Sequence, residues 1–104
     1  MTFDQKVWNL CKKIPKGKVS TYKELAQALD TRAYRAVGNA MHRNPHGAWT
    51  TKGKDMVPCH RVINSNGRIG GFARGKAAKI TLLKEEGVEV EQEKIDLKRF
   101  LYSF

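Results

Sequence analysis

The sequence predicts a single small domain, mainly α with a short β wing, that contains a winged-helix-like helix-turn-helix. Its length of 104 residues suits one hydrophobic core and leaves no room for two. Two short helical patterns flank a break at 30–32, as in a helix-turn-helix. A β-branched stretch follows them, and Asn66-Gly67 after it is typical of a hairpin turn. We therefore expect residues 1–104 to form one domain.

The first helix is expected over Phe3 to Ile14, where apolar residues follow the 3.6-residue period. Cys11 falls on this apolar stripe, which favours a small buried thiol without a chemical role. The segment Pro15-Lys16-Gly17 ends the helix. A short connection at 18–20 follows.

A second helix is expected from Ser20 to Leu29, because Thr21 and Glu24 have the spacing of a capping box. A third helix is expected from Ala33 to Arg43 and is rich in small residues. Helices that read the major groove usually project Arg, Asn or Gln toward base edges. Small residues suit a narrow minor groove or sequence-independent contact, and helix packing would explain them equally well.

A polar, irregular loop is expected at 46–56, because Asn44-Pro45 ends the third helix. Residues 57–64 contain a β-branched run, and residues 68–69 follow the Asn66-Gly67 turn. These two stretches are expected to pair as the β-ribbon of the wing.

The C-terminal third of the chain begins with a glycine-rich loop at 70–75. A helix is expected to follow the loop and end at Glu86, with Gly87 as its C-cap. The remaining segment alternates charged and apolar residues. Residues 86–104 are therefore expected to fold back as an ordered strap.

The charge of the chain is strongly positive and unevenly distributed. The formal net charge is +10. Residues 1–80 contain 16 Lys and Arg against 4 Asp and Glu, whereas residues 81–104 contain 4 against 6. A block this basic favours a polyanionic partner through counterion release, although a merely soluble basic surface has the same composition.

Cysteine usage and hydropathy exclude several protein classes. Cys11 and Cys59 do not form a C-x-x-C pair, which argues against a disulfide scaffold and against a thiolate metal site. The sequence contains no apolar run of about 18 to 20 residues and starts without a signal-peptide core. We expect an intracellular protein that is cytoplasmic and nucleoid-associated, or nuclear in a eukaryote, with no membrane partner.

The adjacent pair Cys59-His60 is the candidate chemical centre. A thiol reacts as its thiolate, and a nearby histidine lowers the thiol pKa. Neighbouring side chains in extended backbone point to opposite faces, so His60 reaches the sulfur only if the backbone turns or a water transfers the proton. A distant carboxylate such as Glu86 would orient the imidazole. Taken alone, an inert pair is the default interpretation.

Four motifs of this chain together resemble a known family. They are Pro58-Cys59-His60-Arg61-Val62, Arg35-Ala36-Val37-Gly38, Asn44-Pro45 and Leu82-Leu83-Lys84-Glu85-Glu86-Gly87. The chain is similar to the C-terminal domain of O6-alkylguanine-DNA alkyltransferases, from about Phe3 to Gly87. The resemblance implies a monomeric, cofactor-free methylated-DNA–protein-cysteine S-methyltransferase. Such proteins bind DNA by the minor groove, flip the alkylated guanine and irreversibly accept its alkyl group.

The resemblance also implies roles for individual residues. Cys59 would be the acceptor and His60 its water-mediated base, with Glu86 polarising His60 and Asn44 holding the active-site turn. Arg35 would fill the gap left by the flipped base. Expected in the guanine pocket are Tyr22, which also presses on a phosphate, Met41, the Val62 backbone, Phe72 and Ala73. Further expected DNA contacts are Tyr34, Ala36, Gly38, Asn39 and Arg61.

Several features depart from the family pattern. The usual N-terminal domain is expected to be absent, and the link from Pro45 to Pro58 is longer, with Trp49, Lys52 and Lys54. Phe72 stands where many members have Tyr, and Ala73 where some have Ser.

Two alternative functions remain open. The short chain and its ending are similar to alkyltransferase-like proteins, which bind alkylated guanine and pass the lesion to excision-repair proteins. Those proteins have Trp or another residue in place of the cysteine, so Cys59 argues against this interpretation. A plain helix-turn-helix regulator is the other alternative.

Overall fold

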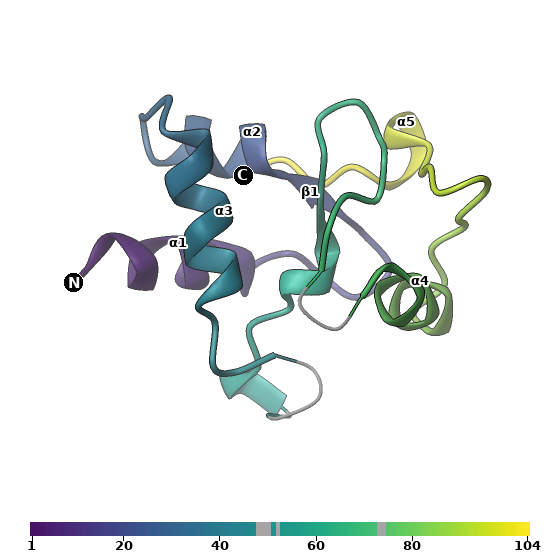
Figure 1. The fold of residues 1–104 in the computed structure, drawn as a ribbon, viewed down its shortest axis with the longest axis horizontal. Coiled ribbons are helices and arrows are strands. Elements are labelled where there is room, and N and C mark those ends of the chain that lie inside the picture. Colours follow the sequence, from purple (N-terminus) through teal and green to yellow (C-terminus); the bar gives the residue numbers. More distant parts are fainter. Residues whose placement is uncertain (48–50, 52, 73–74) are drawn as a thin grey trace.

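The computed structural model describes residues 1–47, 51, 53–72 and 75–104. The elements follow one another as α1 (Phe3–Cys11), β1 (Ser20–Thr21), α2 (Tyr22–Ala28), α3 (Tyr34–His42), η1 (Gly53–Asp55), η2 (Cys59–Arg61), β2 (Val62–Ile63), α4 (Lys76–Glu85) and α5 (Leu97–Phe100), where η marks a 3₁₀ turn. The described part is mainly helical with one small sheet, which confirms the predicted fold class (Figure 1). Trp49, Lys52 and Ala73 lie outside the described residues.

The helix ends follow from local hydrogen bonds. Thr2 and Gln5 form a reciprocal capping box at the start of α1, with bonds of 3.0 and 3.1 Å. The Thr21 hydroxyl accepts from the Glu24 amide at 3.1 Å and starts α2. Helix α1 ends at Cys11, one turn earlier than predicted, because Pro15 disfavours a helical conformation in the residue before it.

The small sheet is parallel, which corrects the predicted β-ribbon. Strands β1 and β2 pair with Ser20 opposite Val62. Ser20 and Thr21, expected to begin the second helix, therefore form a strand, and α2 begins at Tyr22. The turn after Asn64 does close, with Gly67 N donating to Asn64 O at 3.0 Å. Asn64 N also donates to Arg68 O at 3.0 Å, so the two expected stretches do meet across the turn by one further bond. No more extended ladder forms between them in the described residues, and Arg68 pairs instead with Lys94. Parallel pairing joins segments that are distant in sequence, and local patterning does not reveal such partners.

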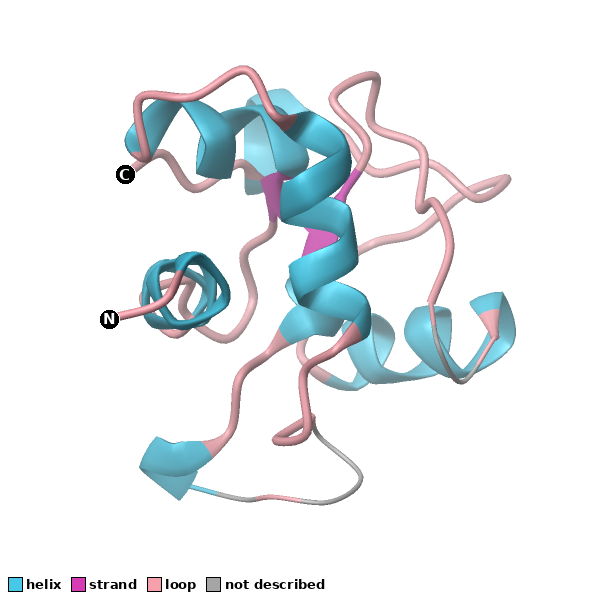
Figure 2. Cartoon of the chain, turned by 60° about the vertical axis from the view of Figure 1, so that its left-hand side comes forward, coloured by secondary structure: helices cyan, strands magenta, loops and turns pink. Residues whose placement is uncertain are grey.

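Two hydrophobic clusters support the fold. The first contains Val7, Leu25 and Val37 from α1, α2 and α3, and the second contains Ile63, Leu83 and Phe100 from β2, α4 and α5. Figure 2 shows the two short strands between the N-terminal helices and α4. This arrangement places β2, directly after η2, at the junction of the two clusters.

The helix-turn-helix pair and the C-terminal segment are both tied to the rest of the chain. Trp8 Nε1 donates to Ala40 O at 2.8 Å, which fixes α1 against α3. The C-terminal segment runs beside β1: Val19 N donates to Phe100 O at 2.9 Å, and Tyr102 N donates to Val19 O at 2.7 Å. No helix in the described part of the chain is long and apolar enough to cross a bilayer.

Candidate active site

Cys59 begins the 3₁₀ turn η2, directly after Pro58. The turn is closed by Arg61 N, which donates to Pro58 O at 2.9 Å. Because the backbone is turned here, the Cys59 and His60 side chains need not point to opposite faces, as they would in an extended strand. The Cys59 thiol is free and partly exposed, whereas His60 is completely buried.

His60 and Arg61 both bind the carboxylate of Glu86, the C-cap residue of α4. His60 Nε2 lies 3.0 Å from Glu86 Oε2. Arg61 makes a two-bond contact, with Nε to Oε1 at 2.8 Å and Nη2 to Oε2 at 2.7 Å, and its Nη1 donates to Ile14 O at 2.9 Å. The structure therefore places Arg61 inside the molecule, on Glu86, and not on the exposed surface expected for a DNA contact.

The electrostatics of this cluster keep Glu86 ionised. Burial opposes its ionisation, but the hydrogen bonds from Arg61 and His60 outweigh burial and lower the pKa of Glu86 to about 2. The other ring nitrogen of His60, Nδ1, is buried and has no hydrogen-bond partner among the described residues. A fixed carboxylate on one ring nitrogen and an available second nitrogen are what a general base requires.

Asn44 lies between the end of α3 and the Cys59 turn. Its amide nitrogen donates to Val57 O at 3.1 Å, and its Oδ1 accepts from His46 N at 2.9 Å. Burial raises the pKa of the Cys59 thiol, while the Asn44 amide and the charge of Lys79 act in the opposite direction. Gly47 also passes close to the thiol, since a Cβ built on it would lie 3.9 Å from Cys59 Sγ.

Lys79 is a buried cation that the sequence patterns did not single out. Its Nζ donates to Val62 O and Ile69 O at 2.7 Å each and to Gly71 O at 3.2 Å. Burial lowers its pKa to about 8. Lys79 thus connects the strand after the Cys59 turn to the glycine-rich loop. The available signal was its spacing of four from Leu83, which places it on the inner face of α4.

The Cys59 thiol opens into a hollow of about 180 Å³. Its lining residues are Tyr22, Gly38, Met41, His42, Cys59, Gly71 and Phe72. Three side chains expected in the guanine pocket, Tyr22, Met41 and Phe72, are therefore brought together at the sulfur. Val62 is buried and is not among the lining residues, and its carbonyl accepts from Lys79 Nζ. The hollow is smaller than the ~300–1,000 Å³ of sites for drug-sized ligands, which suits a compact group.

A wider groove of about 720 Å³ adjoins this hollow, because Tyr22 and Gly38 line both. The groove is also lined by Lys23, Tyr34, Arg35 and the turn residues Asn64, Ser65 and Asn66. Three of the expected DNA contacts, Tyr34, Arg35 and Gly38, thus lie together. Asn39 is exposed and Ala36 half-buried on α3, and neither lines the groove.

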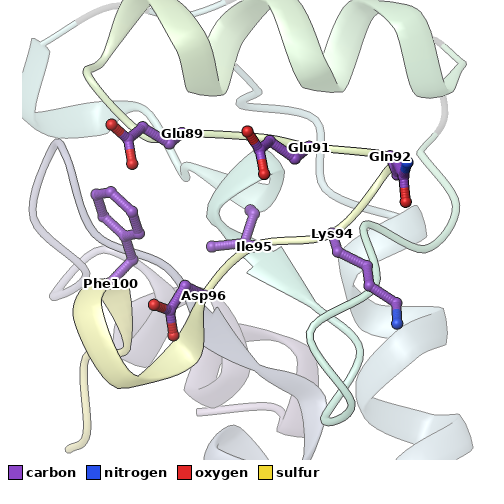
Figure 3. A pocket seen from close by; sticks show the side chains of 7 residues that line it. All are labelled: Glu89, Glu91, Gln92, Lys94, Ile95, Asp96 and Phe100. Atoms are coloured by element: carbon purple, nitrogen blue, oxygen red, sulfur yellow. The ribbon is translucent and has the colours of Figure 1, made fainter.

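A third hollow, of about 800 Å³, lies in the C-terminal segment, and no candidate residue lines it. Figure 3 shows its acidic side chains around Ile95 and Phe100. The full lining is Glu89, Glu91, Gln92, Lys94, Ile95, Asp96 and Phe100. It contains neither a thiol nor an imidazole. Within the described ranges, no group of three or more His, Cys, Asp or Glu side chains is arranged to hold a metal ion.

Comparison with known proteins identifies relatives of both the sequence and the fold. The family model for 6-O-methylguanine DNA methyltransferase, DNA binding domain, matches residues 2–88. A methylated-DNA–protein-cysteine methyltransferase of Methanosarcina acetivorans is 45% identical over 86 residues, which cover 82% of this chain and 51% of that protein. The chain spans about half the length of the curated methyltransferases it matches.

Two solved structures resemble the fold closely. S. pombe Atl1, in complex with damaged DNA containing O6-carboxymethylguanine, superposes with a TM-score of 0.81 at 35% identity, covering 98% of this chain and 95% of that one. The O6-methylguanine-DNA methyltransferase of Pyrococcus kodakaraensis has a TM-score of 0.71 at 43% identity, covering 85% of this chain and 47% of that one. With the family model matching most of its length, this chain belongs to the 6-O-methylguanine DNA methyltransferase family, as a DNA-binding domain of that family.

Proposed function

We propose that this chain repairs O6-alkylguanine in double-stranded DNA by one irreversible transfer of the alkyl group to Cys59. The observation that carries the proposal is the setting of this thiol. It opens into a compact hollow beside Tyr22, and the next residue, His60, binds a carboxylate that Arg61 fixes. In this proposal Arg61 positions Glu86 and does not contact DNA.

In the transfer step, the Cys59 sulfur attacks the alkyl carbon that is bonded to O6. The S–C bond forms, the C–O6 bond breaks, and the bonding electron pair passes to the guanine. The thiol proton moves to His60 through a bridging water as the sulfur attacks, and an equivalent proton reaches the guanine through solvent, so that guanine leaves as a neutral base. Glu86 remains ionised and stabilises the imidazolium. The bonds balance without a cofactor, and the stable thioether explains why each molecule acts once.

In this proposal, α3 binds the minor groove of the DNA. The excess of basic residues in 1–80 supplies phosphate binding without sequence preference, as lesions in any sequence require. Arg35 would occupy the gap left by the flipped guanine, and Tyr22 would press on the adjacent phosphate. Ala36, Gly38 and Asn39 would allow close approach of the helix. Flipping costs a few kcal/mol, less for a base whose pairing alkylation has weakened, and an inserted side chain offsets part of it.

The test is the mass of the intact protein after incubation with a duplex that carries one O6-methylguanine. We expect a gain of one methyl group that is absent in Cys59→Ser and retained in Cys11→Ala. Cys11 is the matched control because it is the other cysteine and is fully buried. An unchanged mass would rule out transfer.

The same experiment separates the alternatives. The similarity to Atl1 over 98% of the chain favours, as second candidate, a lesion-binding protein that passes alkylated guanine to excision-repair proteins. Such a protein would bind the methylated duplex tightly without gaining mass. A helix-turn-helix regulator would instead prefer one DNA sequence whether methylated or not.

A further inference from the structure

Tyr34 is an exposed aromatic residue that packs into neither hydrophobic cluster of the described residues. It is 46% exposed, and the other exposed large hydrophobic side chains of the described residues are Met1 at 80% and Phe104 at 39%. Tyr34 begins α3, belongs to neither hydrophobic cluster, and follows Ala33, which provides no side-chain cap. Tyrosine also has no helix-propensity advantage there. Its ring therefore stabilises neither the core nor the helix end.

The ring instead lines the groove that adjoins the Cys59 hollow. Tyr34 shares this groove with Arg35, the next residue of α3, and with Lys23, and its described lining contains two cations and no carboxylate. Asn64, Ser65 and Asn66 also line the groove. A positively charged groove that also presents an aromatic ring fits a nucleic acid, because cations bind phosphates and a ring stacks on bases.

We propose that Tyr34 is a specificity-determining residue that stacks on a base next to the gap filled by Arg35. This inference rests on the lesion binding that is part of the proposed function. Consecutive helical residues point in different directions, so Tyr34 and Arg35 contact neighbouring parts of the DNA. The cation of Arg35 also gains binding energy from the phosphates of intact DNA. The uncharged ring of Tyr34 gains binding energy chiefly where a base face is accessible, that is, where a base pair has opened. Tyr34 therefore favours damaged over intact DNA.

The test measures dissociation constants of the 104-residue chain for two duplexes of one sequence, with and without a single O6-methylguanine, at one salt concentration. All variants carry Cys59→Ser, so that no transfer disturbs the equilibrium. We expect Tyr34→Ala to reduce the preference for the damaged duplex on the order of tenfold, within the range of base–aromatic stacking. Tyr34→Phe should retain the preference. Phe104→Ala is the matched control, because Phe104 is 39% exposed and lies outside the groove.

The outcomes separate this inference from the proposed function. Equal weakening on both duplexes by Tyr34→Ala, no weakening, or no lesion preference in the parent protein would each overturn the role of Tyr34. If the Cys59-containing protein gains no methyl group but Tyr34→Ala still lowers the preference, transfer fails and the role of Tyr34 is supported. If the methyl group is gained and the preference is unchanged in Tyr34→Ala, only the role of Tyr34 fails. Circular dichroism of each variant reports whether it is folded.

Discussion

The hollow at Cys59 and the hollow in the C-terminal segment differ in the burial of the charged side chains near them. Near Cys59, Arg61 and Lys79 are buried and hydrogen-bonded, Arg61 to Glu86 and Lys79 to three carbonyls. At the C-terminal hollow, whose lining includes Glu89 (Figure 3), charge faces solvent: Glu89 pairs with Arg99, and their side chains are 66% and 62% exposed. Size favours the second hollow, at about 800 against 180 Å³. Buried, oriented charge and not volume therefore singles out the Cys59 hollow as the candidate site.

The largest effect is expected when the buried cluster loses its cation. Arg61→Leu leaves the Glu86 carboxylate buried without its two-bond partner, and Ile14 O loses a donor. The free energy of unfolding should fall by about 3–5 kcal/mol, as for other broken buried ion pairs. Urea unfolding followed by tryptophan fluorescence measures it. Arg32→Leu, at an exposed arginine, should change the value by less than about 0.5 kcal/mol. Equal losses in the two variants would contradict the difference between buried and exposed charge.

A somewhat smaller effect is expected on acidification. The pKa of Glu86 is about 2 in the folded chain against 4.5 as its ordinary value. Below pH 4.5 the unfolded chain therefore takes up this proton first, so the cluster's contribution is present above pH 4.5 and is lost as pH falls toward 2. The loss amounts to about 3 kcal/mol at most. Urea midpoints between pH 6 and pH 2 should show a shallower decline in Glu86→Gln.

Glu85→Gln is the matched control, because Glu85 is the exposed neighbour of Glu86. It should keep the acid dependence of the parent chain. Glu86→Gln should also slow methyl transfer by about 10²-fold, the lower end of general-base contributions, with lesion affinity nearly unchanged. A large loss of affinity would make Glu86 a purely structural residue.

Removing the second buried cation is expected to cost less. Lys79→Met takes the donor from Val62 O, Ile69 O and Gly71 O, so the free energy of unfolding should fall by about 1–3 kcal/mol. The loss of positive charge should also raise the pKa of Cys59. The pH profile of alkylation by iodoacetamide measures this shift, since burial raises the pKa of Cys11 and keeps that thiol unreactive. Lys84→Met, at an exposed lysine of α4, should leave the profile unchanged.

Local sequence patterns predicted the parts of the fold that local interactions determine. The Thr21 cap, the helix-turn-helix spacing and Gly87 after α4 all depend on hydrogen bonds or backbone angles within a few residues. The Thr2 capping box has the same local origin and was overlooked. The parallel pairing of β1 with β2 was not predictable, because its two segments lie some forty residues apart in the register Ser20 to Val62.

In the candidate site, too, the sequence predicted some of the residues and not others. The Pro58-Cys59-His60-Arg61-Val62 motif identified the thiol, its neighbour and, through the resemblance, the distant Glu86. It did not show that Arg61 turns inward, because an arginine next to a reactive residue is equally compatible with DNA contact or a buried ion pair. Lys79 was missed because lysine is almost never buried without a charged partner, and only the three-dimensional position of its carbonyl acceptors explains it.

The smallest effect is expected at the C-terminal hollow. Glu89→Gln removes the ion pair with Arg99, but both side chains are largely exposed, so water and salt already screen their attraction. Arg99 also keeps its position over the Phe100 ring, 4.9 Å from the centroid. The free energy of unfolding should therefore change by less than about 0.5 kcal/mol, with the transfer rate altered by less than about twofold. Urea unfolding measures the free energy, and single-turnover kinetics measure the transfer rate, with Glu86→Gln assayed in parallel for comparison. A loss of transfer rate in Glu89→Gln as large as that in Glu86→Gln would contradict this expectation and show that the C-terminal segment is coupled to Cys59. The contact that could transmit such coupling is at Val19, the residue before β1, which is hydrogen-bonded to Phe100 O and Tyr102 N.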